Sequence, residues 1–510
     1  MQRKMVWLVV VMMITLLVAG CAQKTTKTPV ASGDQGKADK ELVVGLSQVC
    51  NNFDPYGSYG DDTLGHMQVY DTLVIKDKDG KIVPSLAEKY DVSPDGKTIA
   101  FHLKKGVKFT NGLEFKASDA KFSIDNGVKS SFTNWAMTGV FDSKVVDDYT
   151  INVNLKKPDV SFLEKLTWIF MVSEEAYKKY GDQYGKSVES AIGTGPYTLK
   201  EWKPGELAVL EANSDYFQGA PDIKKVRFKS ISDANAAVIA LQTGEIGLYL
   251  KDVPGMAVDT LAKNEKVTLT PFSSYVFMDV LMNCQTGPFT NVQLRRAVAY
   301  AVDRQKMLQV GTEGQGAIVD CPGGPDYIGN PNLKTWYQMD VEKAKQFVKE
   351  AGMEGKTVTI KTMSTDPYPK LATALQADLN KIGLNAKVEQ LEMSAYSEKI
   401  WQKADYEIAI SRYWSGTKDM SETMSLLESG GSMNTAKYSN PAIDPLLTKA
   451  SAELNTEARK PLYTEALKIF TQDVPLIPLY YTQGTRAYSK ALTIDAGNVQ
   501  YDHICYYKWK

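Results

Sequence analysis

Histidine and closely paired cysteines, the residues that hold most structural metal ions, are scarce in this sequence. The 510 residues include three histidines and five cysteines, and no two cysteines form a CxxC pair. The histidines, His66, His102 and His503, lie far apart along the chain. Structural zinc sites need about four Cys or His ligands at short spacings. We therefore expect neither a metal site nor another cofactor.

The sequence also lacks an excess of charge of either sign. Lysine plus arginine number 59 and aspartate plus glutamate number 60, which gives a formal net charge of -1. Proteins that bind nucleic acid present a basic surface, so we expect no nucleic-acid partner. A chain of 510 residues is longer than the ~250–300 residues that a single core supports, which predicts two or three domains.

No catalytic motif is present. Neither GxSxG nor HExxH occurs, and Gly311, Gly314 and Gly316 lack the spacing and the following Lys-Ser/Thr of a phosphate-binding loop. A hydrolase would need a base and a nucleophile, which the binding residues identified below do not supply. We therefore predict that the protein is not an enzyme.

Long apolar runs are absent except at the N-terminus. Residues 5–17 are almost entirely apolar and follow two basic residues. A membrane span needs about 20 apolar residues, so this run is typical of an export signal. The next residues, VAGC at 18–21, resemble the lipobox of bacterial lipoproteins. The pattern predicts a signal peptide over residues 1–20 and a lipid on Cys21, and the alternative is an ordinary signal peptide with a chance cysteine.

The residues after the lipobox are too polar to fold. Residues 22–40 contain no aromatic residue and one large aliphatic residue, Val30, so they cannot bury enough surface to offset the entropy of ordering. We expect a flexible tether over residues 21–40. A lipid and a tether together predict a protein that is extracytoplasmic and lipid-anchored to the cell membrane.

Hydrophobic patterning differs on the two sides of Asn283. Before it, apolar and polar residues alternate over 98–103 and 149–155, which is typical of antiparallel strands. After it, long helical patterns such as Asn291 to Leu308 alternate with strands such as Thr357 to Met363, as in a sheet covered by helices. Two patterns in one chain predict an α/β protein with two lobes, between which small ligands usually bind.

Five blocks of sequence, in order, resemble the family-5 extracellular solute-binding proteins of ABC importers, the oligopeptide-, dipeptide- and nickel-binding group. The resemblance covers essentially the whole chain from Leu42 onward. The blocks are VYDTLVIKDKDGKIVPSLAEKYDVSPDGKTIAFHLKKGVKFTNGLEFKASDAKFS from Val69, GTGPYTLKEWKPGE from Gly193, ALQTGEIGLYL from Ala240, MNCQTGPFTNVQLRRAVAYAVDR from Met282 and LIPLYY from Leu476.

The resemblance implies a two-lobed periplasmic-binding-protein-like fold of type II, in a three-domain variant. Lobe I would combine a core domain of residues 41–73, 191–282 and 483–510 with an insert domain of residues 74–190. Lobe II would span residues 283–482. Two segments would cross between the lobes, near Asn283 and Tyr481.

The same resemblance implies a function that needs no chemistry from the protein. The lobes would close by a hinge over a di- to oligopeptide and present the closed form to an ABC permease and its ATPase. We expect a monomer. A nickel or other metal chelate, or an oligosaccharide, is the alternative ligand, and an extracellular sensor or receptor or a hydrolase is a more distant alternative.

The resemblance also indicates where a peptide would bind. In peptide-binding relatives an extended peptide lies between two chain segments and pairs with them like an added strand. The matching positions are Gly57, Ser58 and Tyr59 on lobe I, and Tyr413, Trp414 and Ser415 on lobe II. The alternative interpretation of residues 57–59 is a surface turn.

One expected residue is missing from the peptide site. Peptide-binding relatives hold the ligand ammonium with an aspartate three residues after the tryptophan, and here Thr417 occupies that position. The nearest acid is Asp419, which either reaches the ammonium or caps a helix.

Two further residues, Trp135 and Arg412, complete the candidate set and leave the ligand class open. Trp135 and Trp414 match positions where a nickel-binding relative places aromatic residues, although Trp135 is equally well explained as a core residue. Arg412 is a candidate partner for a ligand carboxylate, with a solvated surface role as its alternative. No histidine lies near Trp414 in sequence, which argues against direct metal ligation.

Overall fold

A computed structural model describes residues 40–58, 60–77, 80–334, 336–494 and 503–510. The expected signal peptide, Cys21, and the tether up to residue 39 fall outside the described residues. Lys40–Lys510 forms one compact unit. Among the residues that the structure describes, no helix has both the length and the apolar composition needed to cross a membrane.

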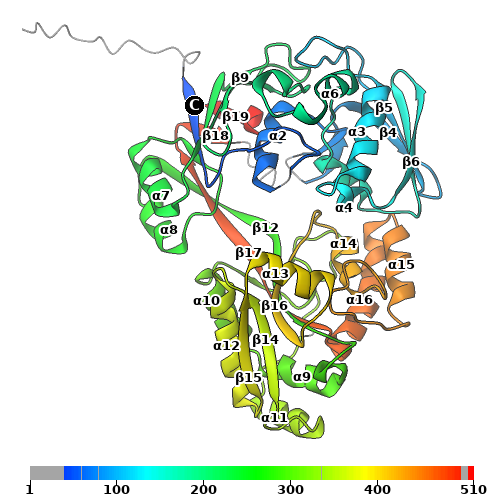
Figure 1. Ribbon diagram of the computed structural model, residues 1–510, viewed down its shortest axis with the longest axis vertical. Coiled ribbons are helices and arrows are strands. Elements are labelled where there is room, and N and C mark those ends of the chain that lie inside the picture. The colour runs from blue at the N-terminus through cyan, green and yellow to red at the C-terminus, as the bar shows by residue number, and fades with distance from the viewer. Residues whose placement is uncertain (1–39, 59, 78–79, 335, 495–502) are drawn as a thin grey trace, which may run out of the picture. The chain divides into compact units, whose positions relative to one another are not determined.

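Eleven strands of the described chain form one large mixed sheet (Figure 1). Its order is β15-β14-β16-β12-β17-β11-β1-β10-β9-β8, and β13 pairs with β17 outside this path. In that order the strands span Asn385–Leu391, Thr357–Met363, Ile408–Trp414, Val267–Met282, Leu476–Ser489, Leu248–Tyr249, Glu41–Leu46, Lys225–Ser230, Leu207–Ala212 and Tyr197–Lys203, with β13 at Gly316–Ile318.

Two long strands, β12 and β17, run through both halves of this sheet. They pair antiparallel, with a register break between Ser273 and Phe277 and a smaller shift between Met278 and Asp279. On one side of the break β17 also pairs with β11, and on the other side β12 also pairs with β16. The break precedes Asn283, where the family resemblance puts the first crossing, and it adjoins Tyr481, where the resemblance puts the second.

Buried apolar side chains separate into two large clusters. The C-terminal core takes its members from residues 277–481. The N-terminal core takes its members from residues 42–250 and 492–509. A smaller cluster joins helices α7 and α8 to the first half of β12. Separate cores are expected for a chain of this length.

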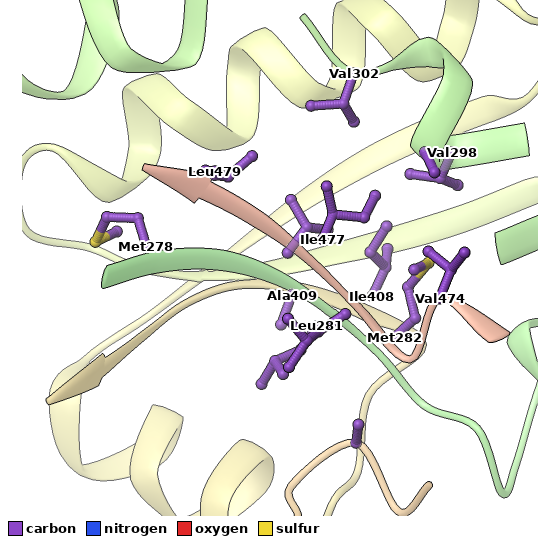
Figure 2. Packing of buried hydrophobic residues seen from close by; sticks show 14 of the residues in the cluster. Met278, Leu281, Met282, Val298, Val302, Ile408, Ala409, Val474, Ile477 and Leu479 are labelled. Atoms are coloured by element: carbon purple, nitrogen blue, oxygen red, sulfur yellow. The ribbon is translucent and has the colours of Figure 1, made fainter. Parts of the chain in front are cut away.

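In the C-terminal core, helices pack against strands whose successive side chains point to opposite faces of the sheet. Met282 of β12 lies opposite Ile408 of β16, and Figure 2 shows both among the packed side chains together with Val298 of α9. The helices of this part are α9 (Val292–Ala301), α10 (Arg304–Thr312), α11 (Val341–Glu350), α12 (Tyr368–Lys381), α13 (Met393–Tyr396), α14 (Met420–Met424), α15 (Asp444–Ala452) and α16 (Thr456–Asp473), with the π-helix η7 (Ser397–Gln402) after α13.

The region predicted as one helix from Asn291 to Leu308 is instead two helices, and that prediction was wrong. Val302 is extended, with φ -74° and ψ 120°, and ends α9. The Asp303 side chain then accepts a hydrogen bond from the Lys306 backbone N–H and caps α10. The spacing of apolar residues continues across Asp303, so it predicts one helix. The helix nevertheless ends here, because the aspartate side chain caps the start of a second one.

The N-terminal core combines its share of the large sheet with smaller sheets and short helices. The alternation predicted over 98–103 and 149–155 corresponds to β5 (Thr98–Leu103) and β7 (Thr150–Leu155), the central strands of a four-stranded sheet. Its outer strands are β4 (Ala87–Val92) and β6 (Val140–Asp147), and the two-stranded sheets are β2 (Val74–Lys76) with β3 (Ile82–Pro84) and β18 (Leu492–Ile494) with β19 (Tyr507–Trp509). The helices are α2 (Thr63–Val69), α3 (Ala117–Lys129), α4 (Asn134–Met137), α5 (Phe162–Lys165), α6 (Glu174–Tyr180), α7 (Ala234–Thr243) and α8 (Gly255–Ala262).

Candidate ligand-binding site

Three tryptophans from distant parts of the sequence meet at one point. Trp135 lies in α4, Trp168 ends the short 3-10 helix η3 (Leu166–Trp168), and Trp414 ends β16. Their ring centroids are 5.3 Å apart for Trp135 and Trp414, 5.7 Å for Trp168 and Trp414, and 6.4 Å for Trp135 and Trp168. All three contacts are edge to face, a favoured geometry for aromatic pairs. This cluster joins the N-terminal half of the chain to the C-terminal half.

The loop of residues 415–419, which follows Trp414, is held against this cluster. The indole Nε1 of Trp168 donates a hydrogen bond of 2.8 Å to the Gly416 carbonyl. A Cβ atom built on Gly416 would lie 2.0 Å from Cζ3 of Trp135. Any larger residue at position 416 would therefore displace the Trp135 ring or the loop itself.

Buried carboxylates hold the same loop from both sides. Glu164 of α5 accepts a hydrogen bond of 2.8 Å from the Lys418 backbone N–H and pairs with the Lys76 ammonium. Glu422 of α14 accepts 2.7 Å and 2.6 Å hydrogen bonds from the Gly416 N–H and the Thr417 hydroxyl. Burial raises the pKa of Glu164 and of Glu422. The loop is thus fixed by hydrogen bonds that depend on buried acids.

A cavity of about 440 Å³ adjoins Trp414 on the C-terminal side. We call it the Arg412 cavity. The strands β12 and β16 contribute Asp279, Ser411, Arg412 and Tyr413 to its wall, and η7 contributes Trp401. Arg412, Tyr413 and Trp414, which the sequence predicts as binding residues, therefore line one cavity.

A second cavity, of about 300 Å³, adjoins Trp168 on the N-terminal side. We call it the Arg486 cavity. The guanidinium of Arg486 lies 4.7 Å from the centre of the Phe272 ring, and Lys251 forms a 2.5 Å ion pair with Asp61. Because Trp168 lines this cavity and Trp414 lines the other, the tryptophan cluster lies between two cavities that each carry an arginine.

Asp279 is the most unusual group in the Arg412 cavity. Its side chain is 2% exposed, and its Oδ1 has no hydrogen-bond partner. Burial raises the pKa of Asp279 to about 8. An acid with this pKa is mostly neutral near pH 7. Asp279 was not among the residues predicted from the sequence, although one acid within the apolar strand VFMDVLM was the available signal.

Of the residues expected to bind a peptide on lobe I, Gly57 and Ser58 lie at a turn next to the Arg486 cavity. The Gly57 N–H donates to the Asp54 carbonyl at 3.0 Å and the Ser58 hydroxyl donates to the Asn52 carbonyl at 3.2 Å, as in a tight turn. Tyr59 falls outside the described residues. The next residue, Gly60, lines the Arg486 cavity, so the turn adjoins that space.

Asp419 is engaged inside the protein. Its two oxygens each accept a 2.7 Å hydrogen bond from Nη1 of Arg459, and one of them also accepts from the Ser421 N–H at the start of α14. Asp419 and Arg459 are 3% exposed. This geometry favours the alternative in which Asp419 caps a helix.

Ser415 has a role within the loop, and two residues that line the Arg486 cavity, Trp168 and Arg486, were not predicted from the sequence. Ser415 is fully buried and its hydroxyl donates to the Thr417 carbonyl, so its side chain shapes the loop. Trp168 lies within the apolar run LTWIFMV, which reads as core in sequence. Arg486, late in the chain, carries no motif. In the part of the chain that the structure describes, no group of three or more His, Cys, Asp or Glu side chains is arranged to hold a metal ion.

The fold is that of a periplasmic binding protein. Residues 81–435 match the family model described as bacterial extracellular solute-binding proteins, family 5 middle region. The chain therefore belongs to the family-5 extracellular solute-binding proteins of ABC importers, as the sequence resemblance predicts. Members of this family act outside the cytoplasm.

Relatives with named ligands are similar over almost their whole length. The glutathione-binding protein GsiB of Salmonella paratyphi A is 29% identical over 481 residues, which cover 89% of this chain and 92% of that protein. DppA of Helicobacter pylori, solved in complex with the peptide STSA, is 27% identical with a TM-score of 0.78, covering 92% of this chain and 98% of that one. AgaA of A. tumefaciens R10, solved with agropinic acid, is 25% identical with a TM-score of 0.77, covering 92% and 99%.

Proposed function

We propose that this solute-binding protein captures a di- to oligopeptide between two lobes and delivers it to the permease and ATPase of an ABC importer. The observation that carries this proposal is the contact between Trp168 and Trp414, which line separate cavities and meet edge to face. A ligand that enters both cavities contacts both halves of the chain. Such a ligand favours the closed arrangement over any open one.

The lobes of the proposal follow the expected domain boundaries. Lobe I has a core domain of residues 41–73, 191–282 and 483–510 and an insert domain of residues 74–190, and lobe II spans residues 283–482. The division of the buried side chains into an N-terminal and a C-terminal core supports the boundary between the two lobes. The hinge is the register break of β12 and β17, because two strands can bend there without disturbing either core.

The ligands of similar proteins support a peptide. GsiB is named for glutathione, a tripeptide, and DppA was solved with the tetrapeptide STSA. AgaA, solved with agropinic acid, extends the range to other small solutes. The peptide backbone pairs with residues 57–59 on lobe I and with residues 413–415 on lobe II, while its side groups enter the two cavities.

An oligosaccharide is the second candidate, and the three clustered indoles favour it. Sugar rings present apolar faces that stack on tryptophan. A metal chelate has less support, because the residues around Trp414 that the structure describes include no histidine. The peptide remains preferred because both cavities carry arginines suited to carboxylates, Arg412 and Arg486.

The proposal also covers catalysis, oligomeric state and attachment to the membrane. It catalyses no reaction, needs no cofactor and works as a monomer. A lipid on Cys21 holds it to the cell membrane, and residues 22–40 form the tether. Labelled fatty acid incorporation into the wild type and into Cys21→Ala tests the anchor, which requires label in the first protein alone.

The ligand assignment is tested by a binding panel. Tryptophan fluorescence of the purified protein is titrated with glutathione, the peptide Ser-Thr-Ser-Ala, maltotriose and a nickel–histidine chelate. The proposal expects a saturable signal with at least one peptide. Saturation by maltotriose alone identifies the second candidate, and saturation by the chelate alone contradicts both. Incubation of the bound peptide with the protein, followed by mass spectrometry, checks that no bond is cleaved.

A further inference from the structure

Asp279 combines deep burial with the absence of a partner inside a candidate ligand cavity. It lies on β12 opposite Ser411 of β16 and Pro478 of β17. Successive side chains of a strand point to opposite faces, so Asp279 shares its face with Leu281, which also lines the Arg412 cavity. Nothing in the described structure donates to its Oδ1, although buried carboxyl oxygens almost always have a partner.

The groups around Asp279 do not neutralise it. Tyr368 of α12, Tyr396 of α13 and Tyr406, which precedes β16, are close enough for its charge to raise their pKa values. Arg412 is the neighbouring cation, yet its side chain is exposed, and the pKa of Asp279 is set by burial without a contribution from it. Although Arg412 lines the same cavity, it does not offset the burial of Asp279.

The rest of the wall suits the carbon stem of a basic group. Beside Asp279 the cavity is lined by Leu281, Met393, Trp401, Leu426 and Met433. Methionine and tryptophan surfaces pack well on methylene groups, and tryptophan also attracts cations. A cation that reaches Asp279 would supply the hydrogen-bond partner that its Oδ1 lacks. The cation would lose its water next to the carboxylate, which offsets the cost of burying it.

We propose that Asp279 binds an ammonium or guanidinium group of the captured solute. This inference rests on the proposed function, since it takes the Arg412 cavity to be part of the ligand site. In that site Asp279 takes the role of the acid that peptide binders carry at the position of Thr417. The group is either the N-terminal ammonium of a peptide or the side chain of a basic residue.

If Asp279 binds a cation of the ligand, ligand binding changes its protonation, which would not happen if the acid were purely structural. In the empty protein Asp279 holds a proton near pH 7, because burial raises its pKa to about 8. A bound cation stabilises the carboxylate, so binding releases a proton to the buffer. Calorimetry in phosphate and in Tris, which differ in ionisation enthalpy, measures that release as a difference in apparent binding enthalpy.

Three peptides of equal length separate the possible cations. Ala-Ala-Ala carries only the N-terminal ammonium, acetyl-Ala-Arg-Ala carries only a guanidinium, and acetyl-Ala-Ala-Ala carries neither. We expect one cationic peptide to bind at least about tenfold more tightly than the neutral one and to release close to one proton. Which of the two it is identifies the source of the cation. Equal affinities for all three would overturn the inference while leaving peptide capture intact.

Asp279→Asn keeps the size of the side chain and removes its ability to become negatively charged when a cation binds. In this variant we expect the preference for the cationic peptide to fall to less than about threefold and the proton release to disappear. Asp71→Asn is the matched control, because Asp71 is also buried but accepts hydrogen bonds from Thr194 and Tyr216 outside both cavities. It should keep both the preference and the release. Persistence of both in Asp279→Asn contradicts the inference.

Failure of all three peptides to bind would count against the proposed peptide ligand rather than against Asp279. The inference is then decided by the solute that co-purifies with the protein. A solute without a basic group overturns it. A basic solute that remains bound to the wild type and to Asp71→Asn, but is lost from Asp279→Asn, supports it.

Discussion

The indole of Trp168 and the carbonyl of Gly416 are joined by a hydrogen bond of 2.8 Å that is buried from solvent. Trp168 belongs to the N-terminal core and Gly416 to the loop that follows β16. A buried hydrogen bond of this kind is costly to break from one side, because the remaining group loses its partner without regaining water. This bond is therefore a specific link between the two halves of the chain.

Replacing Trp168 by phenylalanine removes the donor and keeps an aromatic ring. We expect Trp168→Phe to lower the free energy of unfolding by about 1–3 kcal/mol, because the Gly416 carbonyl is left unpaired. Urea denaturation followed by far-UV circular dichroism measures the change. Trp336→Phe is the matched control, since Trp336 is buried in the C-terminal core and its Nε1 has no hydrogen-bond partner. A loss as large in the control as in Trp168→Phe would show that the indole N–H does not matter.

Trp414 is the residue through which a ligand should be seen most directly. It ends β16, lines the Arg412 cavity and contacts both other tryptophans of the cluster. We expect Trp414→Ala to weaken ligand binding by about 2 kcal/mol or more, as for a buried aromatic anchor, and to abolish most of the fluorescence response. Titration with the tightest solute of the panel measures both effects, and Trp336→Phe should retain them. Wild-type affinity in Trp414→Ala would remove this residue from the site.

Asp419 is predicted to act through Arg459 rather than through the ligand. Breaking a buried ion pair by removing one charge typically costs about 3–5 kcal/mol, because the other charge stays buried without a partner. We expect Asp419→Asn to lower the free energy of unfolding by an amount in this range. Peptides with free and with acetylated N-termini should lose affinity equally, as measured by calorimetry. A selective loss for free N-termini would restore the ammonium-binding interpretation of Asp419.

His66 should make the protein less stable in mild acid. Burial lowers the pKa of His66 to about 4, while an unfolded histidine titrates near 6.5. As the pH falls from about 6.5 to 4, the unfolded chain takes up a proton that the folded chain does not, so stability decreases. At about pH 5 this difference amounts to about 2 kcal/mol.

The variant His66→Gln removes this titration and keeps a hydrogen-bond donor toward the Asn52 carbonyl, which the His66 ring contacts at 2.8 Å. We expect its stability loss between about pH 7 and pH 5 to be smaller than that of the wild type by about 2 kcal/mol. Urea denaturation at the two pH values gives the comparison. His102→Gln, at a partly exposed histidine, should behave like the wild type. Identical pH dependence in His66→Gln and wild type would mean that His66 takes up its proton over the same pH range in the folded and the unfolded chain.

Local patterns were sufficient to predict much of the architecture. The strand expected at Thr357–Met363 has those bounds in the structure, because its β-branched residues, with Val358 and Ile360 alternating with threonines, are typical of a strand. The break between α9 and α10 was missed, since Asp303 acts as a cap only once Val302 is extended. Family resemblance identified the region around Trp414, which periodicity alone would have assigned to a strand end.

Contacts between distant residues could not be predicted in the same way. The partner of Asp419 is Arg459, on a different helix, and no local pattern connects them. Trp168 reaches Gly416 from far along the chain, and its apolar neighbours give it the appearance of a core residue. Asp279 becomes informative only when its burial and lack of a partner are known. Such features depend on tertiary packing, which side-chain periodicity does not encode.

The central claim, capture of a small solute at the tryptophan junction, is tested most directly by native mass spectrometry of the protein as purified from its own cells. The account predicts a small-molecule adduct on the wild-type protein, released intact on denaturation and absent from Trp414→Ala. A wild-type protein that carries no adduct, and that takes up none of the panel solutes when they are added back, would contradict it.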